Sequence, residues 1–188
     1  MQSIYDLNMK MATDMLAEKG QKSYRAKQLF QWLYRKRVGS FQEMTDMPAS
    51  LLEELAQEYS IEPVKEITRQ VARDGTTKYL FQLADGSSVE TVLMHFHFGE
   101  SLCVTSQLGC NMGCTFCASG LLKKQRDLTA GEIVGQVMFV QKELDKIGKR
   151  VDNVVIMGTG EPFDNYDNVM RFCEIINSDL GLAIGARH

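Results

Sequence analysis

The sequence contains no apolar run close to the ~20 residues that a membrane-spanning helix needs, and no charged-then-apolar leader at its N-terminus. It has no excess of basic residues either. A net charge of −3 and a pI near 5.7 exclude an overall basic nucleic-acid binder, so any RNA contact must come from a local patch. The five cysteines are an odd number gathered mainly in one region, unlike the disulfide framework of a small secreted domain. We therefore expect a cytoplasmic protein with no membrane partner.

Acidic residues are absent between Lys19 and Glu43, where six basic residues occur. Apolar residues at helical spacing predict a helix from about residue 24 to residue 37, with its basic residues on the face opposite the apolar stripe. Basic side chains interleaved with aromatics are typical of a surface that contacts RNA phosphates and bases. A solvated helix face whose aromatics pack on the next element explains the same pattern equally well. The residues concerned are Arg25, Lys27, Trp32 and Arg35.

The hydrophobic period changes twice along the chain. Helical spacing is found up to about residue 62, alternation follows to residue 98, and strand–loop–helix units begin near Leu102. Asp-Gly pairs at 74–75 and 85–86 predict tight turns between strands, and Thr129 with Glu132 predicts a capping box. The expected helices are 8–19, 24–37, 48–59, 129–148 and 165–177, and the expected strands are 64–72, 76–83, 88–96, 102–106 and 151–157.

Residues 110–117 contain three cysteines, with three and then two residues between them. Soft thiolates bind zinc or iron–sulfur clusters, and the two are separated by counting ligands. A structural zinc takes four protein ligands, whereas a [4Fe–4S] cluster held by three cysteines keeps one iron open to a chelating cofactor. The spacing therefore favours Cys110, Cys114 and Cys117 as ligands of a [4Fe–4S] cluster over three buried or zinc-bound cysteines.

A Gly-Thr-Gly-Glu-Pro stretch at 158–162 directly follows the apolar strand expected at 151–157. Glycine lets the backbone approach a ligand closely, and Glu161 offers a carboxylate to an amino group. A plain turn would also account for Gly160 and Glu161. The position of the stretch after the strand that follows the cysteines favours a cofactor contact.

The alternation of strands and helices, with motif-bearing loops after the strands, is typical of a (β/α) barrel. We expect an α+β N-terminal region, made of a helical accessory domain (1–62) with a possible RNA contact and an antiparallel β ribbon linker (63–98). An α/β partial barrel (99–188) follows it. Only about two β/α units are expected in the sequence, and a third strand would fall near residues 186–188. Cys173, at helical spacing with apolar residues, is expected in the core.

The cysteine spacing, with Phe116 before the last cysteine, resembles the radical S-adenosylmethionine (SAM) superfamily. That resemblance implies a six-unit partial barrel, of which about half is expected here. It also implies a SAM molecule that chelates the open iron and is cleaved reductively to a 5′-deoxyadenosyl radical.

Residues 89–94 and 102–110, preceded by the helical region and the ribbon, make the whole chain similar to the RlmN/Cfr family of RNA adenosine methyltransferases. The resemblance implies Glu90 as a proton acceptor beside the target adenine, and Cys103 as the partner of a methyl-carrying cysteine. It implies the same three cluster ligands, and SAM contacts at Gly160 and Glu161.

The resemblance also implies a route that uses two SAM molecules. One methylates a C-terminal cysteine, and the radical from the second abstracts hydrogen from that methyl group. The resulting methylene radical adds to adenine, and a disulfide to the methyl-carrying cysteine resolves the adduct. RlmN members act on C2 of an adenosine in 23S rRNA and in certain tRNAs, and Cfr members act on C8. An electron donor such as flavodoxin or ferredoxin is implied as a further partner.

Two departures from the family pattern matter. Thr159 stands where the family usually has Met, and the family places the methyl-carrying cysteine in a C-terminal part beyond these residues. We therefore expect the chain alone to be inactive. Pro162 favours RlmN over Cfr, although a Cfr-like C8 methyltransferase stays an alternative. A radical SAM enzyme for a small molecule or protein, and a non-catalytic metal-binding fragment, are the other hypotheses.

Overall fold

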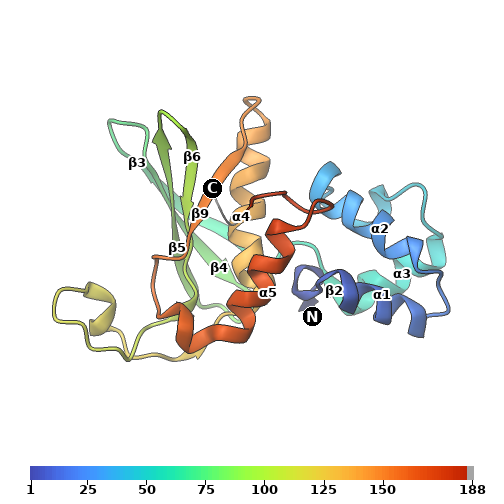
Figure 1. The fold of residues 1–188 in the computed structure, drawn as a ribbon, viewed down its shortest axis with the longest axis horizontal. Helices are drawn as coiled ribbons and strands as arrows, with labels where there is room; N and C mark the ends of the chain where they lie inside the picture. The colour runs from blue at the N-terminus through green and yellow to red at the C-terminus, as the bar shows by residue number, and fades with distance from the viewer. Residues whose placement is uncertain (186–188) are drawn as a thin grey trace.

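The computed structural model describes residues 1–185. Its N-terminal region is helical, and a five-stranded sheet with two long helices follows (Figure 1). The third barrel strand expected near residues 186–188 lies outside the described residues. The helices are α1 (Met9–Glu18), α2 (Tyr24–Phe30), the π-helix η2 (Gln31–Lys36), α3 (Ala49–Glu58), α4 (Ala130–Asp145) and α5 (Tyr166–Asn177), with 3-10 turns η1 (Ile4–Asp6), η3 (Phe41–Glu43), η4 (Ala118–Leu121) and η5 (Pro162–Asn165).

The sheet has the strand order β3-β4-β5-β6-β9. The first four strands are antiparallel, and β9 pairs in parallel with β6. The ribbon therefore continues through β6 into the first β/α unit as one sheet. Its strands are β3 (Val64–Val71), β4 (Thr77–Leu83), β5 (Ser88–Phe96), β6 (Gly99–Cys103) and β9 (Val151–Val155); two-stranded pairs are formed by β1 (Gln2–Ser3) with β2 (Tyr59–Ser60), and by β7 (Gln107–Leu108) with β8 (Arg126–Asp127).

The two Asp-Gly turns of the ribbon are confirmed. Gly75 and Gly86 have φ of 87° and 86°, a left-handed conformation that glycine adopts without a Cβ penalty. Each aspartate side chain accepts a hydrogen bond from the backbone N–H two residues later, at 2.9 Å in both turns. The capping box of Thr129 and Glu132 at the start of α4 is also confirmed.

Two predicted strands are wrong in detail. The strand expected at 102–106 is β6, which begins at Gly99 because it forms a hairpin with β5 and leaves the sheet after Cys103. The strand expected at 151–157 ends at Val155, and within it only Val151 is buried. Continuous burial fails because β9 is an edge strand of the described sheet, and the face opposite α4 carries no helix among residues 1–185.

Helix α4 covers one face of the sheet. The ring of Phe139 packs edge-on against Phe81 and Tyr79, with centroids 4.9 and 6.2 Å apart. The alternating burial of β4 and β5 follows from this contact. Side chains that face α4 are shielded from water, whereas those on the opposite face of the sheet are more exposed. Burying each large apolar side chain stabilises the fold by roughly 1.5–3 kcal/mol.

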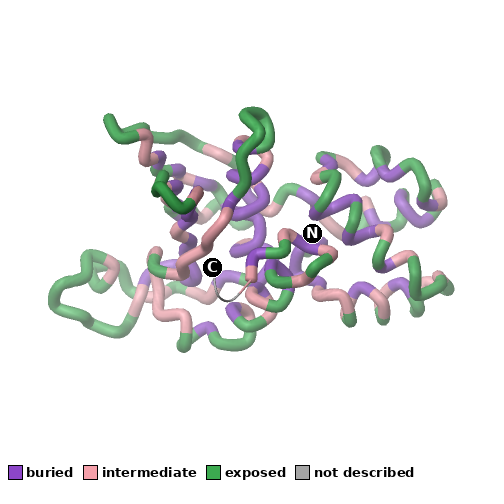
Figure 2. The backbone as a smooth tube through the Cα atoms, turned by 45° about the horizontal axis from the view of Figure 1, so that its top comes forward, coloured by how far each residue is buried: buried purple, intermediate pink, exposed green. Residues whose placement is uncertain are grey.

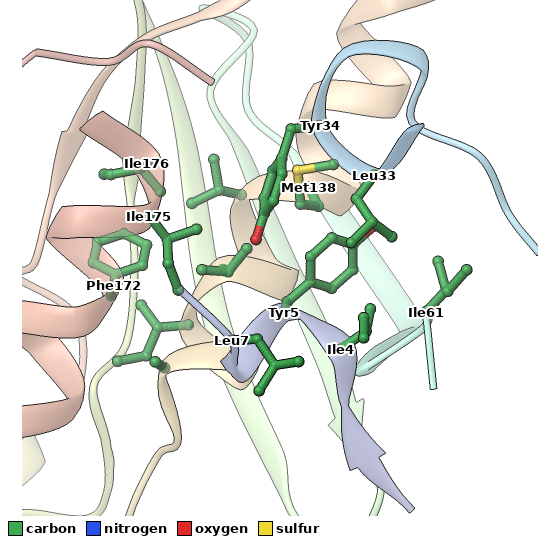
Figure 3. Close-up of a cluster of buried hydrophobic side chains, with 14 of the residues drawn as sticks. Ile4, Tyr5, Leu7, Leu33, Tyr34, Ile61, Met138, Phe172, Ile175 and Ile176 are labelled. Carbon is green, nitrogen blue, oxygen red and sulfur yellow. The ribbon is translucent and has the colours of Figure 1, made fainter. Parts of the chain in front are cut away.

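The N-terminal helical region packs on the other side of α4. Figure 3 shows side chains of η1, η2, α4 and α5 converging on one cluster, which includes Tyr5, Tyr34, Met138 and Phe172. Glycine on α4 permits this approach, since a Cβ on Gly135 would lie 2.4 Å from Cγ of Pro63. The carboxylate of Asp6 accepts a hydrogen bond from the N–H of Gly131, at 2.6 Å, in the first turn of α4. The helical region is therefore fixed to the sheet region by a buried core.

No helix within the described part of the chain has both the length and the apolar character needed to span a membrane.

Candidate active site

The segments that follow β6 and β9 are joined by hydrogen bonds. Gly158 N–H donates to the carbonyl of Val104 at 3.0 Å, and the N–H groups of Ser106 and Gln107 both donate to the carbonyl of Thr159 at 3.1 Å. A Cβ on Gly158 would lie 2.6 Å from Oγ1 of Thr105. The Gly-Thr-Gly stretch therefore lies directly on the segment that leads into the cysteine loop, because β6 and β9 are parallel neighbours whose C-terminal ends share one edge.

Gly160 has φ of 113° and packs against a side chain of this protein. A Cβ at this position would lie 2.6 Å from Cβ of Gln107. The sequence-based interpretation gave this glycine the role of admitting a ligand. The structure adds a second requirement, since the place of its missing side chain is taken by Gln107.

The Glu161 side chain caps η5, because its Oε1 accepts a hydrogen bond from the N–H of Phe163 at 3.0 Å. Its own N–H donates to Oε1 of Gln107 at 2.8 Å. The second carboxylate oxygen, Oε2, has no hydrogen-bond partner within residues 1–185. Glu161 is half-buried at the sheet edge, so its backbone is fixed while one oxygen can accept from a ligand.

The cysteine loop, defined here as residues 109–125, joins β7 to β8 and extends away from the body of the protein (Figures 1 and 2). Cys114 and Cys117 are exposed and Cys110 is half-buried; all three are free thiols. The loop is closed at its base, where Cys110 N–H donates to the carbonyl of Leu122 at 2.8 Å. In the described part of the chain, no three His, Cys, Asp or Glu side chains lie close enough together to hold a metal ion.

The thiols of the candidate site differ in acidity. Hydrogen bonds from the hydroxyl and backbone of Ser119 lower the pKa of Cys117. Burial raises the pKa of Cys103, opposed in part by a hydrogen bond from the backbone of Met157. Exposed, acidified thiols are the better metal ligands and nucleophiles, so the loop cysteine has the more reactive environment.

Glu90 and Cys103 lie on one face of the sheet, on neighbouring strands. Cys103 is directly opposite Val92 in the β5–β6 pair, and Glu90 is two residues before Val92, so all three share the face turned away from α4. Glu90 is exposed and forms an ion pair with Lys78 at 2.9 Å. Because β5 runs antiparallel to β6, Glu90 lies at the edge where β6 ends.

Two buried polar residues that the sequence interpretation missed hold this edge together. The amide of Gln136, on α4, exchanges hydrogen bonds with both backbone groups of Thr105 at 2.9 and 3.0 Å, and accepts one from the hydroxyl of Thr91 at 2.7 Å. The side chain of Asn165 donates to the carbonyls of Ser106 and Leu128, at 2.8 Å each. The sequence signal for Gln136 was its position as a polar residue within the apolar stripe of the predicted 129–148 helix. The sequence carries no comparable signal for Asn165.

The expected RNA surface is placed on α2 and η2, at the end of the long axis opposite the cysteine loop (Figure 1). Trp32 was expected on the open face, and that expectation is wrong. Its side chain is buried, its Nε1–H donates to Asp46 at 2.5 Å, and the Lys36 ammonium lies 3.2 Å from its ring centroid. The reason is a tertiary contact: the segment that carries Asp46 packs over this face of the helix and accepts hydrogen bonds from Arg25, Gln28 and Trp32.

The remaining basic residues of this surface are partly engaged. Arg25 donates to the carbonyl of Asp46 at 2.8 Å, and Arg35 donates to the carbonyl of Asp179. Lys27 is exposed. Lys27 therefore has the side chain that is most available for a phosphate contact among the four predicted residues.

Two family models match the chain. The model described as "Ribosomal RNA large subunit methyltransferase N-terminal domain" matches residues 2–61, and "Radical SAM superfamily" matches residues 104–187. The two boundaries fall close to the end of the helical region and to the end of β6.

Similar proteins cover nearly all of this chain. A "Probable dual-specificity RNA methyltransferase RlmN" from Streptococcus suis (strain 98HAH33) is 57% identical over 99% of the chain and 51% of that protein. A protein of the same description from Enterococcus faecalis (strain ATCC 700802 / V583) is 57% identical over 100% of the chain and 53% of that protein. The chain thus spans about half the length of the curated relatives that it matches.

A solved structure has the same fold. The crystal structure of a radical SAM methyltransferase from Sphaerobacter thermophilus matches with a TM-score of 0.92 and 38% identity, over 100% of this chain and 55% of that one. The α+β fold with an open, partial barrel is therefore shared with a radical SAM methyltransferase.

Proposed function

Since this chain corresponds over nearly its whole length to the N-terminal half of RlmN-type radical SAM methyltransferases, we propose that it supplies the cluster and SAM-binding half of an enzyme that methylates C2 of adenosine in RNA. The observation that supports the proposal is that the candidate active-site residues all lie at the same end of the sheet. Glu90, Cys103, the cysteine loop and the Gly160-Glu161 pair all lie where β6 and β9 end.

Cys110, Cys114 and Cys117 are the residues that would hold a [4Fe–4S] cluster. Their donor set fits the group, because three soft thiolates on one exposed loop match the chemistry of iron with one position left for SAM. Since the three thiols do not lie together in residues 1–185, the exposed loop would have to bring them together to hold the cluster. When bound, the cluster supplies the electron that cleaves SAM.

Gly160 and Glu161 are the proposed SAM contacts. The free carboxylate oxygen of Glu161 can accept a hydrogen bond from the SAM ammonium, while its backbone stays fixed by Gln107. Charge attraction between carboxylate and ammonium strengthens such a bond.

Glu90 and Cys103 are proposed to act on the RNA base. Glu90 is exposed on the open face, so its carboxylate can accept a proton from an adenine bound there once Lys78 moves aside. Cys103 is the proposed thiol that forms a disulfide with a methyl-carrying cysteine, which the resemblance places beyond residue 188. Its raised pKa keeps it protonated until a base in the site removes the proton.

We propose 23S rRNA and tRNA as substrates, and flavodoxin or ferredoxin as the electron donor. The helical region 1–62 serves as the RNA-contacting accessory domain, the ribbon 63–98 as its link, and 99–188 as the start of the barrel. Both RNA substrates and a reduced iron–sulfur site fit a cytoplasmic location.

The direct test compares two forms of the protein. The 188 residues alone, with SAM and a reductant, should give no methylated adenosine, whereas a chimaera that continues with the C-terminal half of the S. suis relative should give 2-methyladenosine in RNA. Mass spectrometry of RNA nucleosides measures both. Product from the shorter chain would contradict the two-cysteine route, and 8-methyladenosine would move the protein to the Cfr-like alternative.

Elemental analysis tests the hypothesis of a non-catalytic metal fragment. After anaerobic reconstitution we expect iron and sulfide in about equal amounts, as in a cube of four irons. Zinc without sulfide would support the fragment hypothesis instead.

A further inference from the structure

Two donors and two acceptors form a closed ring beside the candidate site. Nε2 of Gln107 donates to Oδ1 of Asp127 at 2.7 Å and to Oδ2 of Asp164 at 3.1 Å. The ammonium of Lys124 contacts the same two oxygens, at 2.8 and 2.7 Å. Each carboxylate is thus held by both donors, and we name these four residues the polar ring.

The polar ring joins three segments of the chain. Gln107 and Asp127 are directly paired in β7 and β8, and Lys124 lies at the exit of the cysteine loop. Asp164 belongs to η5, three residues after Glu161. Oε1 of Gln107 also accepts the N–H of Glu161 at 2.8 Å, so one amide side chain connects the base of the loop to the Gly160-Glu161 pair.

The hydrogen-bonding groups of the Gln107 side chain are all used in this connection. Gln107 is fully buried, and both donor hydrogens and the acceptor of its amide are used. Hydrogen bonds from Lys124 and then Gln107 hold the pKa of Asp164 below its usual range, and those to Asp127 and Asp164 raise the pKa of Lys124. Lys124 and Asp164 therefore both keep the charges that the ring requires near neutral pH.

The rest of the loop has much weaker support. Residues 111–118 are exposed without interruption (Figure 2), and the hydrogen bonds that close the loop are near its two ends. The position of the cysteines relative to Glu161 is therefore set by the base of the loop, where the polar ring lies.

We propose that Gln107 and Lys124 are positioning residues that hold the base of the cysteine loop at a fixed place relative to Gly160 and Glu161. The inference rests on the proposed function in so far as the loop carries the cluster and the Gly-Glu pair contacts SAM. Neither residue needs to touch the reacting atoms. Their contribution is to keep the loop that would hold the cluster at a constant separation from the residues that would contact SAM.

The first test uses the metal-free chain and does not depend on the proposed function. Hydrogen–deuterium exchange of residues 109–125 is compared between Lys124→Met and Lys123→Met. The control removes the same charge from the adjacent position, where the side chain is exposed and forms no hydrogen bond among residues 1–185. Lys124→Met should speed exchange at the loop base about tenfold, as expected for the loss of charge-assisted hydrogen bonds, while Lys123→Met should not.

A second variant, Gln107→Met, keeps the length of the side chain and removes its hydrogen bonds. It should raise exchange both in the loop base and at residues 160–164, because Gln107 joins the two. Equal exchange of the Lys124→Met and Lys123→Met chains, with Gln107→Met also unchanged, would overturn the inference.

The second test reads the positioning role itself. After reconstitution, the electron paramagnetic resonance spectrum of the reduced cluster is recorded with and without SAM. The change caused by SAM should be weaker, or need several-fold more SAM, in Lys124→Met but not in Lys123→Met. If the cluster forms and its spectrum responds to SAM identically in both variants, the polar ring has only a structural role and the positioning role is contradicted. Failure of the unsubstituted chain to bind any cluster would instead count against the proposed function, and the exchange comparison would still decide whether the ring holds the loop.

Discussion

The hydroxyl of Thr105 donates a hydrogen bond to the backbone carbonyl of Glu90, with 2.7 Å between the two oxygens. The same hydroxyl oxygen accepts the N–H of Thr159 at 3.2 Å. One buried side chain therefore ties the start of β5, the end of β6 and the stretch after β9 to one another. The carboxylate of Glu90 is held beside the segment that leads to the cysteines.

Replacing Thr105 by Val should destabilise the protein by about 1–3 kcal/mol, because the buried partners of the hydroxyl lose their hydrogen bonds. Thr105→Ser keeps the hydroxyl and should cost less. Urea denaturation of the two variants and the unsubstituted chain measures the difference. A valine variant as stable as the serine variant would show that these hydrogen bonds do not hold the edge.

Replacing Cys110, Cys114 or Cys117 by Ala should prevent assembly of a [4Fe–4S] cluster, because two thiolates cannot hold a cube that already lacks one protein ligand. Iron content and absorbance near 400 nm, as is usual for such clusters, are measured after anaerobic reconstitution. Cys173→Ala is the matched control, since this half-buried cysteine packs against the core and should leave cluster loading unchanged. Full loading in any of the three loop variants would refute the ligand assignment.

The thiols of the metal-free chain should be alkylated in a fixed order as the pH rises. Alkylation follows the thiolate fraction, so a lowered pKa moves the onset of labelling to lower pH and a raised pKa moves it higher. Cys117, whose pKa is lowered by Ser119, should react with iodoacetamide first. Cys103 and Cys173, whose pKa values are raised chiefly by burial, should react last. Mass spectrometry of the labelled peptides gives the order, which would be wrong if Cys103 were modified before Cys117 near neutral pH.

Lys27→Ala should lower the slope of log RNA affinity against log salt by about one, as for the loss of a single phosphate contact. Lys10→Ala removes an exposed lysine of α1 and is the control. Trp32→Phe should reduce stability through the lost hydrogen bond to Asp46 and leave the slope unchanged, since the ring is buried. Binding titrations at several salt concentrations test all three. An unaltered slope for Lys27→Ala would favour the solvated helix face.

The local elements were determined by the sequence. Asp74-Gly75 and Asp85-Gly86 specify their turns because the aspartate bonds its own backbone and glycine accepts positive φ, both of which are effects of adjacent residues. The capping box of Thr129 and Glu132 is equally local. The cysteine spacing and the Gly-Thr-Gly-Glu-Pro stretch indicated a resemblance to radical SAM proteins, and the family model of that superfamily matches residues 104–187.

The tertiary structure decided which side chains are shared between segments distant in sequence. Trp32 is buried because the segment that carries Asp46 packs over it, a tertiary contact that helical spacing could not predict. Gly160 is glycine partly because Gln107, 53 positions earlier, occupies the space beside it. Gln107, Thr105 and Asn165 have no recognisable pattern along the chain, since their partners meet only when β6 and β9 pair in parallel. Periodicity reports the neighbours within one element, whereas the architecture of this site depends on contacts between elements that only the folded chain brings together.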